Sequence, residues 1–244
     1  MFGMMAAGTR HVNAAGPTTA FYNTLLLNGS SQYVTCPDSI ISGGADFSIR
    51  IRFKIGSDIS TTQYILGLFA TDNSDSSMLR LEIGLDTLYL GYQSSTGTVY
   101  PYSETAVINT WYDIIVTHDF SAKRFEFYLD GVSVAGATYT GTLDTATRTT
   151  LGARNPTGSF ISHLEGALTL TQFFDTVITG ADITELQTLK QPNSYSAAIT
   201  SNYVLALPLN DGVVDPYIDR SADGNDGTAI GSPTFTGEQL EFAL

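Results

Sequence analysis

Residues 111–132 read WYDIIVTHDFSAKRFEFYLDGV, two strand-like segments on either side of a short turn. The segments 111–118 and 124–129 are rich in aromatic and β-branched residues, which favour strands. The dipeptide Asp130-Gly131 comes next, and a two-residue type I′ hairpin prefers it because glycine tolerates positive φ. A return strand then follows directly, so this stretch predicts three consecutive antiparallel strands.

The segment 47–53 shows a strict alternation of apolar and polar residues. This period of two is typical of a strand with one buried face. The apolar positions are Phe47, Ile49, Ile51 and Phe53, and the positions between them are Ser48, Arg50 and Arg52. Further strand segments are expected at 64–69, 79–83 and 88–92, with polar turns between them.

One helix is predicted near residue 180. Thr179 supplies an N-cap hydroxyl and Asp182 an acidic N3 residue, and Ile183, Leu186 and Leu189 share one face. Helices and strands do not alternate along the chain, which excludes a parallel α/β sheet. Short strands with turn signals between them predict an all-β fold, an antiparallel sandwich or jelly roll, with this one short helix.

Composition narrows the classes of partner. Apolar residues make up 43% of the 244-residue chain, enough for a substantial core, while charged residues make up only 14%. The formal charge of −13 repels nucleic acid and anionic lipid, so neither is an expected partner. No apolar run approaches the ~18 residues that a membrane-spanning helix needs, so no membrane insertion is expected.

The N-terminal segment and the single cysteine give expectations about where the chain is made and how its ends and its thiol are used. The opening residues MFGMMAAGTR lack a basic region and a long apolar run, so we expect synthesis in the cytoplasm without a signal peptide. Cys36 alone forms no intrachain disulfide and is expected to be a buried structural thiol. Residues 1–20 are expected to form an extended arm that the core does not need.

Several patterns, taken in order, resemble the laminin-G-like branch of the concanavalin-A-like jelly rolls. The resemblance covers roughly residues 24–190 and implies an antiparallel jelly-roll sandwich. The matching stretches are LLLNGSSQYV (25–34), DFSIRIRF (46–53), WYDIIVTH (111–118), FEFYLDGV (125–132) and a closing section with 150–153, 164–166 and the strand that ends at Phe174.

The C-terminal segment is out of the family's usual order. In the family, a segment like 205–211, followed by a loop like DRSADGNDGT (219–228), normally comes first, and here it comes last. We interpret this as a circular permutation within one domain over 21–244, in which about 203–244 resembles the usual first segment. A truncated second domain is the weaker alternative, because about forty residues cannot bury a core unaided.

The permutation duplicates one strand. The segment 235–244 repeats the kind of strand that 21–28 already supplies, so the two either pair side by side or one pairs with a neighbouring subunit.

The resemblance also implies calcium near the 219–228 loop. Carboxylate and carbonyl oxygens suit this hard cation, and two glycines let the backbone turn inward. The candidate ligands are Asp219, Asp223, Asn225 and Asp226. A tight turn without metal is the alternative, since the strand after Gly166 offers ALTL (167–170) where the family usually supplies a second acidic ligand.

A tyrosine-rich segment is the candidate for carbohydrate recognition. In such sandwiches aromatic rings stack on sugars while amides select among hydroxyl groups. The candidates in LYLGYQSSTGTVYPY (88–102) are Tyr89, Tyr92, Tyr100, Tyr102 and Gln93. The alternative is that these tyrosines are ordinary strand residues, half-buried between sheets. Trp111 is assigned to the core.

Catalysis is not expected. A glycosidase on this sandwich needs two carboxylates flanking a cleft, and Glu82 and Asp86 are the nearest approach. Their spacing crosses a predicted turn, so they do not share a strand face. His118 is expected to be a surface or packing residue, and neither His11 nor His163 lies beside a nucleophile motif.

Function is therefore expected to be structural or adhesive. An extracellular-type β protein without signal peptide, disulfide or anchor fits a bacteriophage virion surface component, such as a capsid decoration, head fibre or tail-tip protein. Its arm over 1–20 would lie on a neighbouring subunit, in a homo-oligomer or on another virion protein. The alternatives are a lectin-type module that binds cell-surface glycan and a polysaccharide-cleaving glycoside hydrolase.

Overall fold

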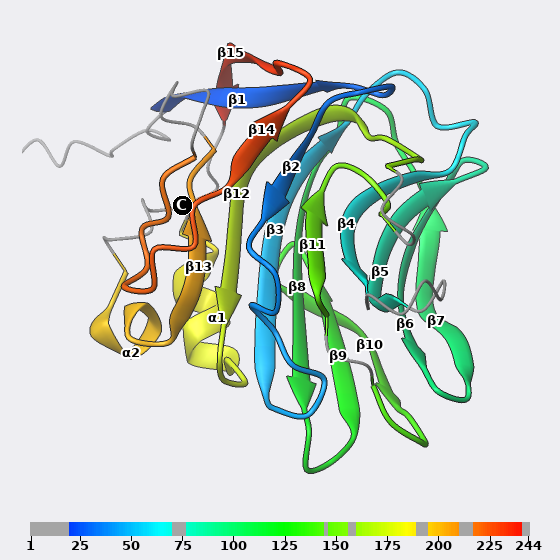
Figure 1. Cartoon of the computed structure of the whole chain (residues 1–244), viewed down its shortest axis with the longest axis vertical. Coiled ribbons are helices and arrows are strands. Elements are labelled where there is room, and N and C mark those ends of the chain that lie inside the picture. Colours follow the sequence, from blue (N-terminus) through cyan, green and yellow to red (C-terminus); the bar gives the residue numbers. More distant parts are fainter. Residues whose placement is uncertain are drawn as a thin grey trace, which may run out of the picture.

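The computed structural model describes residues 20–69, 77–143, 146–155, 160–188, 195–209 and 217–240. These residues form two antiparallel sheets that face each other (Figure 1). The predicted jelly-roll sandwich is confirmed. The expected N-terminal arm over 1–20 lies outside the described residues, apart from Ala20.

The first sheet, called sheet A, contains eight strands. Seven follow one another in the order β10-β9-β8-β3-β12-β1-β15, and β13 (Tyr203–Leu207) also pairs with β12. Their bounds are β10 (Val132–Thr138), β9 (Arg124–Leu129), β8 (Trp111–Asp119), β3 (Phe47–Ile55), β12 (Glu165–Phe174), β1 (Ala20–Asn28) and β15 (Thr234–Leu240).

The second sheet, called sheet B, contains seven strands in the order β14-β2-β11-β4-β5-β6-β7. This sheet curves toward the right of Figure 1, where β4, β5, β6 and β7 lie. The bounds are β14 (Thr228–Ile230), β2 (Tyr33–Cys36), β11 (Arg148–Leu151), β4 (Gln63–Phe69), β5 (Ser77–Gly84), β6 (Thr87–Ser94) and β7 (Gly97–Thr105).

Local sequence signals correctly predicted the core strands. The apolar side chains of β3 are at most 1% exposed and lie between the sheets, as the alternation over 47–53 predicts. At the predicted hairpin, Asp130 has φ 47° and Gly131 φ 79°, the two positive values that a type I′ turn requires. Cys36 is a buried free thiol, as expected.

The other face of sheet A is covered by a second apolar layer. It includes α1 (Gly180–Leu186) and α2 (Ala197–Thr200), which pack on the sheet in Figure 1, and apolar side chains of the sheet's own strands. The predicted cap of α1 is present, since the Thr179 N–H donates to Asp182 Oδ2 at 3.0 Å. Leu189 lies outside the described residues. The buried members of this layer are Ile115, Phe174, Ile178, Ile183, Leu186, Tyr195, Ile199, Tyr203 and Ala206.

The assignment of Trp111 to the core is wrong. Trp111 pairs opposite Lys54 and is half-buried on the outer face of sheet A, with the Arg52 guanidinium 5.6 Å from its ring centroid. Its neighbour Tyr112 takes the core position instead. Apolar character alone did not distinguish the two faces of β8, because the outer face is itself covered.

The strands at the two ends of the described chain are neighbours. β15 pairs with β1 in antiparallel register, from Ala20 opposite Leu240 to Leu26 opposite Thr234. The side-by-side alternative is therefore the one observed, within a single chain. Along β12, β1 pairs with residues 165–168 and β13 with 171–174, so these two strands share one edge of β12. A circular permutation as the origin of this arrangement stays a prediction.

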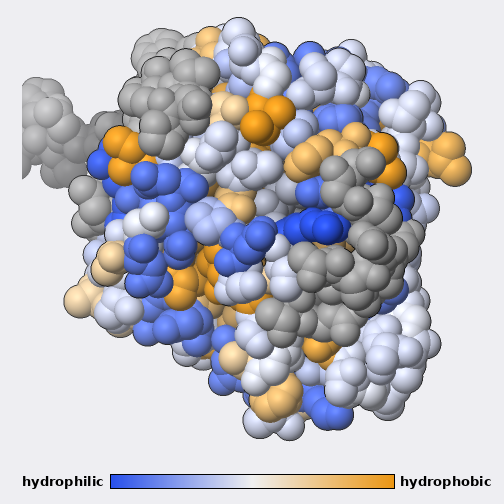
Figure 2. All heavy atoms as spheres, in the orientation of Figure 1, coloured by the Kyte–Doolittle hydropathy of each residue, from blue (hydrophilic) through white to orange (hydrophobic). Residues whose placement is uncertain are grey.

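The coloured surface in Figure 2 is largely hydrophilic, with apolar residues in small groups between the polar ones. Such scattered apolar residues are ordinary on a folded domain. Within the described segments, no helix is long and apolar enough to cross a membrane.

Candidate functional site

Two of the four candidate tyrosines lie together on the outer face of sheet B. Tyr89 on β6 and Tyr100 on β7 have ring centroids 5.2 Å apart, with the rings tilted by 55°. Gly91 makes this approach possible, because a Cβ there would lie 2.4 Å from Tyr100 Cδ1. Tyr100 is 37% exposed and Tyr89 is half-buried. The pair therefore presents aromatic surface to solvent.

Two polar side chains, Glu82 and Arg80, hold the Tyr100 ring, and Gln93 in turn binds Arg80. Tyr100 Oη donates to Glu82 Oε1 at 2.5 Å, and Arg80 Nη1 donates to Tyr100 Oη at 3.5 Å. Arg80 Nη2 also donates to Gln93 Oε1 at 2.5 Å. Burial, together with the bond to Glu82, raises the pKa of the Tyr100 hydroxyl. We call Arg80, Glu82, Tyr89, Gln93 and Tyr100 the tyrosine face.

The other two candidate tyrosines point elsewhere. Tyr92 is 2% exposed, stacks on Phe125 with centroids 4.8 Å apart, and donates to the Thr138 carbonyl. Its ring lies in the core and cannot meet a ligand, so its inclusion in a binding surface is wrong. Tyr102 packs against the core opposite Leu90, and burial raises the pKa of its hydroxyl to about 12.

A β-bulge explains why Tyr100 and Tyr102 point to opposite faces of sheet B. Between the pairs Leu90–Tyr102 and Tyr92–Val99 the register shifts by one residue, so β7 carries an extra residue. Tyr100 and Tyr102 would share a face in a regular strand, but the bulge places them on opposite faces. Sequence analysis also missed Arg80. The available signal was its position on β5 two residues from Glu82, on the polar face of the alternation.

The two carboxylates considered for catalysis are not a pair. Glu82 lies on the tyrosine face and is 9% exposed. Asp86 lies in the tight turn between β5 and β6, with φ 63°, and its N–H donates to the Ile59 carbonyl. The predicted turn between the two residues is confirmed, and they do not face one cleft.

The 219–228 loop is closed by its own hydrogen bonds. Asp219 is 7% exposed, and its Oδ1 accepts from the N–H groups of Ala206 (2.7 Å) and Ser221 (2.8 Å). Its Oδ2 accepts from the Asn225 N–H at 2.7 Å and from the Ser221 hydroxyl. A cation would therefore have to displace donors from both oxygens.

The remaining candidate ligands take separate roles in this loop. Asp226 Oδ1 accepts from the Asp219 N–H at 2.8 Å, and Asn225 Nδ2 donates to the Val204 carbonyl at 2.6 Å. Asp223 is exposed. In the described part of the chain, no three His, Cys, Asp or Glu side chains are grouped to hold a metal ion. Calcium binding and a tight turn without metal both stay predictions for this loop.

His118 is a packing residue, as expected. Its ring is fully buried between Phe47 and Phe125, with centroids 4.7 Å from each. Its Nδ1 lies 3.0 Å from the Ala45 carbonyl and its Nε2 3.0 Å from Tyr139 Oη.

Solved structures share this architecture at low sequence identity. A Bacteroides ovatus protein provisionally described as carbohydrate-binding aligns with 93% of this chain, with TM-score 0.68 and 15% identity. This chain spans 62% of that protein's length. The CBM40 module of Ruminococcus gnavus IT-sialidase, solved with α2,3-sialyllactose, has TM-score 0.52 and 14% identity over 70% of this chain and 99% of its own.

A third similar structure is the heptameric SAP-like pentraxin of Limulus polyphemus, with TM-score 0.54 and 15% identity over 90% of this chain and 93% of its own. At these identities the likeness shows the fold alone. No curated protein matches the sequence. The model of the family described as "Concanavalin A-like lectin/glucanases superfamily" matches residues 28–184, well over half of the 244-residue chain. The chain belongs to the concanavalin A-like lectin/glucanase superfamily.

Proposed function

We propose that this chain is a non-catalytic carbohydrate-binding module whose tyrosine face contacts the sugar. The observation that carries the proposal is the adjacent ring pair of half-buried Tyr89 and exposed Tyr100. Aromatic rings with one apolar face and a polar edge suit a ligand with C–H surfaces and hydroxyl groups. Because Glu82 and Arg80 hold Tyr100, little side-chain entropy is lost when a ligand binds.

The polar groups beside the rings support the same function. Gln93 Oε1 accepts from Arg80 and from Thr98 Oγ1, so its amide has a fixed orientation. Oriented amides and hydroxyls discriminate between sugar epimers by the direction of their hydrogen bonds. The similarity to the Bacteroides ovatus protein and to the sialidase CBM40 module agrees with this class of function.

A glycosidase is less well supported. Glycoside hydrolysis uses two carboxyl groups about 5–9.5 Å apart across the scissile bond. Among the described residues of the tyrosine face, Glu82 is the one carboxylate, and Tyr100 donates to it. A binding surface needs no second carboxylate, so the geometry favours binding over cleavage.

The virion-surface role and the expected assembly through residues 1–20 stay predictions. The similar structures include a carbohydrate-binding module, sialidases and a pentraxin, and these do not bear on a particle. A glycan-binding module is compatible with such a location, since a sandwich on a particle surface can serve as an adhesin.

The proposal is tested on a glycan array with the purified chain. We expect saturable binding to a subset of glycans, and we expect Tyr100→Ala to weaken that binding about tenfold, or about 1.4 kcal/mol. Val99→Ala, at an exposed neighbour on the same strand, is the control and should bind normally. Absence of binding to every glycan, or unchanged binding by Tyr100→Ala, would contradict the proposal.

A further inference from the structure

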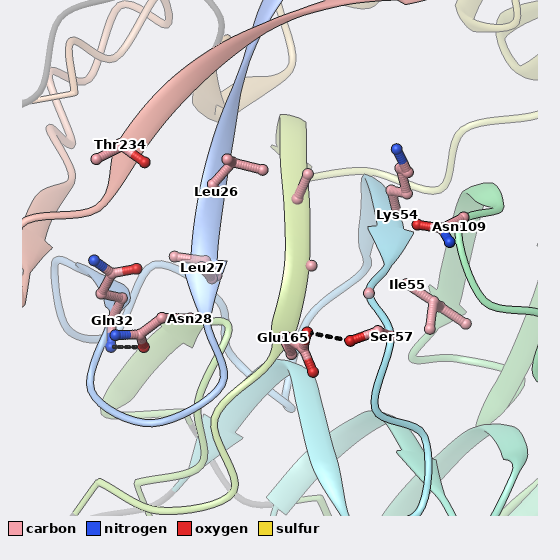
Figure 3. Close-up of a pocket in the computed structure, with 13 residues that line it drawn as sticks. Leu26, Leu27, Asn28, Gln32, Lys54, Ile55, Ser57, Asn109, Glu165 and Thr234 are labelled. Carbon is pink, nitrogen blue, oxygen red and sulfur yellow. Dashed lines mark hydrogen bonds between the residues drawn. The ribbon is translucent and has the colours of Figure 1, made fainter.

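A cavity of about 520 Å³ opens on the outer face of sheet A, whereas the tyrosine face lies on sheet B. Its floor includes Leu26, Ala167 and Lys54, which lie in one row across β1, β12 and β3. Thr234 on β15 forms part of one wall (Figure 3). The cavity therefore combines strands from both ends of the described chain.

Two glycines beside this cavity let the neighbouring backbones approach closely. A Cβ on Gly166 would lie 2.1 Å from the Lys54 carbonyl oxygen, and a Cβ on Gly56 would lie 2.6 Å from the Glu165 carbonyl oxygen. The close approach of β3 and β12 thus requires glycine at both positions. Both glycines line the cavity, as does the short Ala167.

The polar lining is arranged around one carboxylate. Glu165 Oε1 accepts from Ser57 Oγ at 2.7 Å, and Oε2 accepts from the Asp58 N–H at 3.0 Å. These bonds fix the carboxylate, and each oxygen keeps acceptor capacity for a ligand. In Figure 3, Lys54 and Asn109 lie close together on the opposite side of the opening from Gln32.

Asn109 is positioned by the backbone. It has φ 57°, in the left-handed region, and its N–H donates to the Ile55 carbonyl at 2.9 Å. Asn and Gly are the residues that tolerate this conformation best. The side-chain amide at the rim therefore comes from a residue whose backbone is already fixed.

We infer that this cavity is a second binding site, which takes a neutral polyhydroxylated ligand of one or two sugar rings. Its volume lies within the roughly 300–1,000 Å³ of small-molecule sites. Hydroxyl groups donate to Glu165 and accept from Lys54 and Asn109. The negative charge of Glu165 and the positive charge of Lys54 offset each other, so the site does not favour a charged ligand of either sign. The described lining residues include no aromatic ring, which disfavours a flat aromatic ligand.

This site goes beyond the proposed function, since it shares no residue with the tyrosine face and lies on the other sheet. The tyrosine face is an open surface suited to the side of a glycan chain. The cavity is a recess suited to a chain end. Either site can bind without the other.

Amide NMR shifts of the full chain, titrated separately with lactose, maltose, cellobiose and chitobiose, test the inference. We expect at least one of them to shift the amides of Gly56, Asn109 and Gly166. Asn109→Gly keeps the backbone conformation and should weaken that binding about tenfold, the loss expected for one good hydrogen bond. Tyr100→Ala is the control and should leave these shifts unchanged.

The other outcomes overturn the inference. It fails if none of the four sugars shifts these amides, or if the Asn109→Gly variant binds as tightly as the parent chain. Shifts confined to β5, β6 and β7 would overturn it while supporting the tyrosine face. If a sugar shifts the cavity amides but the chain binds no glycan on the array, the cavity is supported. The proposed role of the tyrosine face is then contradicted.

Discussion

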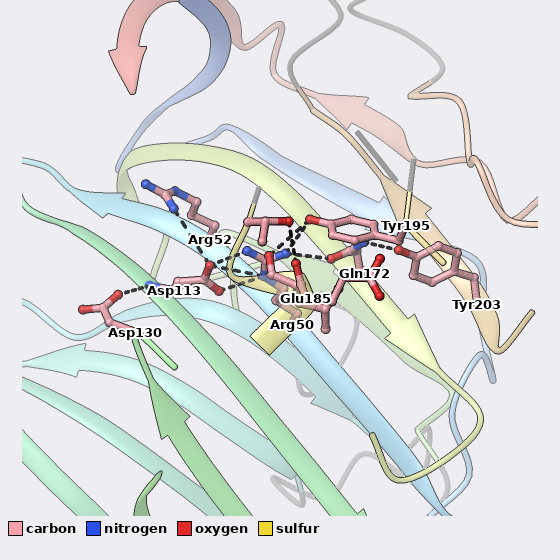
Figure 4. A network of polar contacts seen from close by, with 10 residues as sticks. Arg50, Arg52, Asp113, Asp130, Gln172, Glu185, Tyr195 and Tyr203 are labelled. Carbon is pink, nitrogen blue, oxygen red and sulfur yellow. Dashed lines mark hydrogen bonds and ion pairs between the residues drawn. The ribbon is translucent and has the colours of Figure 1, made fainter. Parts of the chain in front are cut away.

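Arg50 and Asp113 form an ion pair in the interior of the protein, on the face of sheet A that the helices cover (Figure 4). Arg50 Nε donates to Oδ1 and Oδ2 of Asp113 at 2.9 and 3.2 Å, and the side chains are 0% and 3% exposed. Arg50 Nη1 donates to Tyr195 Oη at 3.1 Å and to Gln172 Oε1 at 3.3 Å. Burial lowers the Arg50 pKa, but the facing carboxylate raises it overall, so Arg50 stays protonated.

We predict that Arg50→Met destabilises the protein by about 3–5 kcal/mol, because the buried Asp113 carboxylate loses its hydrogen-bonded partner and retains the longer ion pair with Arg52 Nη1 at 3.9 Å. Urea unfolding followed by tryptophan fluorescence measures this. Arg124→Ala is the matched control, since the Arg124–Glu126 pair is exposed and is expected to contribute about 0–1 kcal/mol. If Arg50→Met does not fold, the double variant with Asp113→Leu should recover folding. Equal unfolding midpoints for Arg50→Met and the parent would contradict the prediction.

This ion pair also marks the limit of what the sequence predicts. The alternation over 47–53 correctly predicts which side chains of β3 enter the core, because a period of two is a local property. It cannot show that Arg50 is buried as well. That depends on Asp113 and on the cover formed by residues within 178–188 and 195–206, all distant in sequence.

The tyrosine face was predictable only in part for a similar reason. The segment 88–102 is rich in tyrosine, and the structure brings Tyr89, Gln93 and Tyr100 together from it. Tyr92 and Tyr102 point to the core side of sheet B. The side to which each tyrosine points depends on the strand register and on a bulge between β6 and β7. The cavity had no signal in any single segment, since its walls come from four strands.

The second prediction concerns the 219–228 loop. Asp219→Asn replaces one oxygen by an NH₂ group, which cannot accept from the Asn225 N–H or the Ser221 hydroxyl. We expect a loss of about 1–3 kcal/mol, the cost of leaving buried donors unpaired. Asp223→Asn changes an exposed side chain and should alter stability by less than about 0.5 kcal/mol. Equal losses in the two variants would mean that the Asp219 hydrogen bonds do not hold the loop.

The third prediction separates the two interpretations of that loop. Because both Asp219 oxygens already accept hydrogen bonds, we expect the same melting temperature in excess calcium chloride and in EDTA. Differential scanning calorimetry measures it. A rise in melting temperature with calcium, abolished by Asp226→Asn, would instead establish the calcium site.

The fourth prediction concerns pH. Burial lowers the pKa of His118 below its ordinary value of 6.5. As pH falls through about 6.5, the unfolded chain gains a proton that the folded chain does not, so folding loses stability. The contribution of neutral His118 is therefore fully present above about pH 6.5 and declines as pH falls toward the folded pKa.

A His118→Gln variant tests the direction of this pH dependence of stability. It should be less stable than the parent at pH 7.5, because the stacking and the contact with Tyr139 are lost. The difference in unfolding free energy should narrow at pH 5.5. His163, whose pKa burial also lowers, is present in both chains and cancels. A difference that is constant between the two pH values would contradict the prediction.

The last prediction concerns the edge strand β15. Deleting residues 234–244 removes one of the two partners of β1 and leaves that edge of residues 20–26 unpaired, while β12 still pairs with residues 25–28. An unpaired edge recruits another strand, so we expect lower stability and a concentration-dependent dimer in light scattering. Deleting residues 1–19 leaves this pairing intact and is the control. It also tests the expected arm, since an assembly held by the arm would dissociate. A monomer as stable as the parent after the 234–244 deletion would mean that β15 contributes nothing to the sheet in solution.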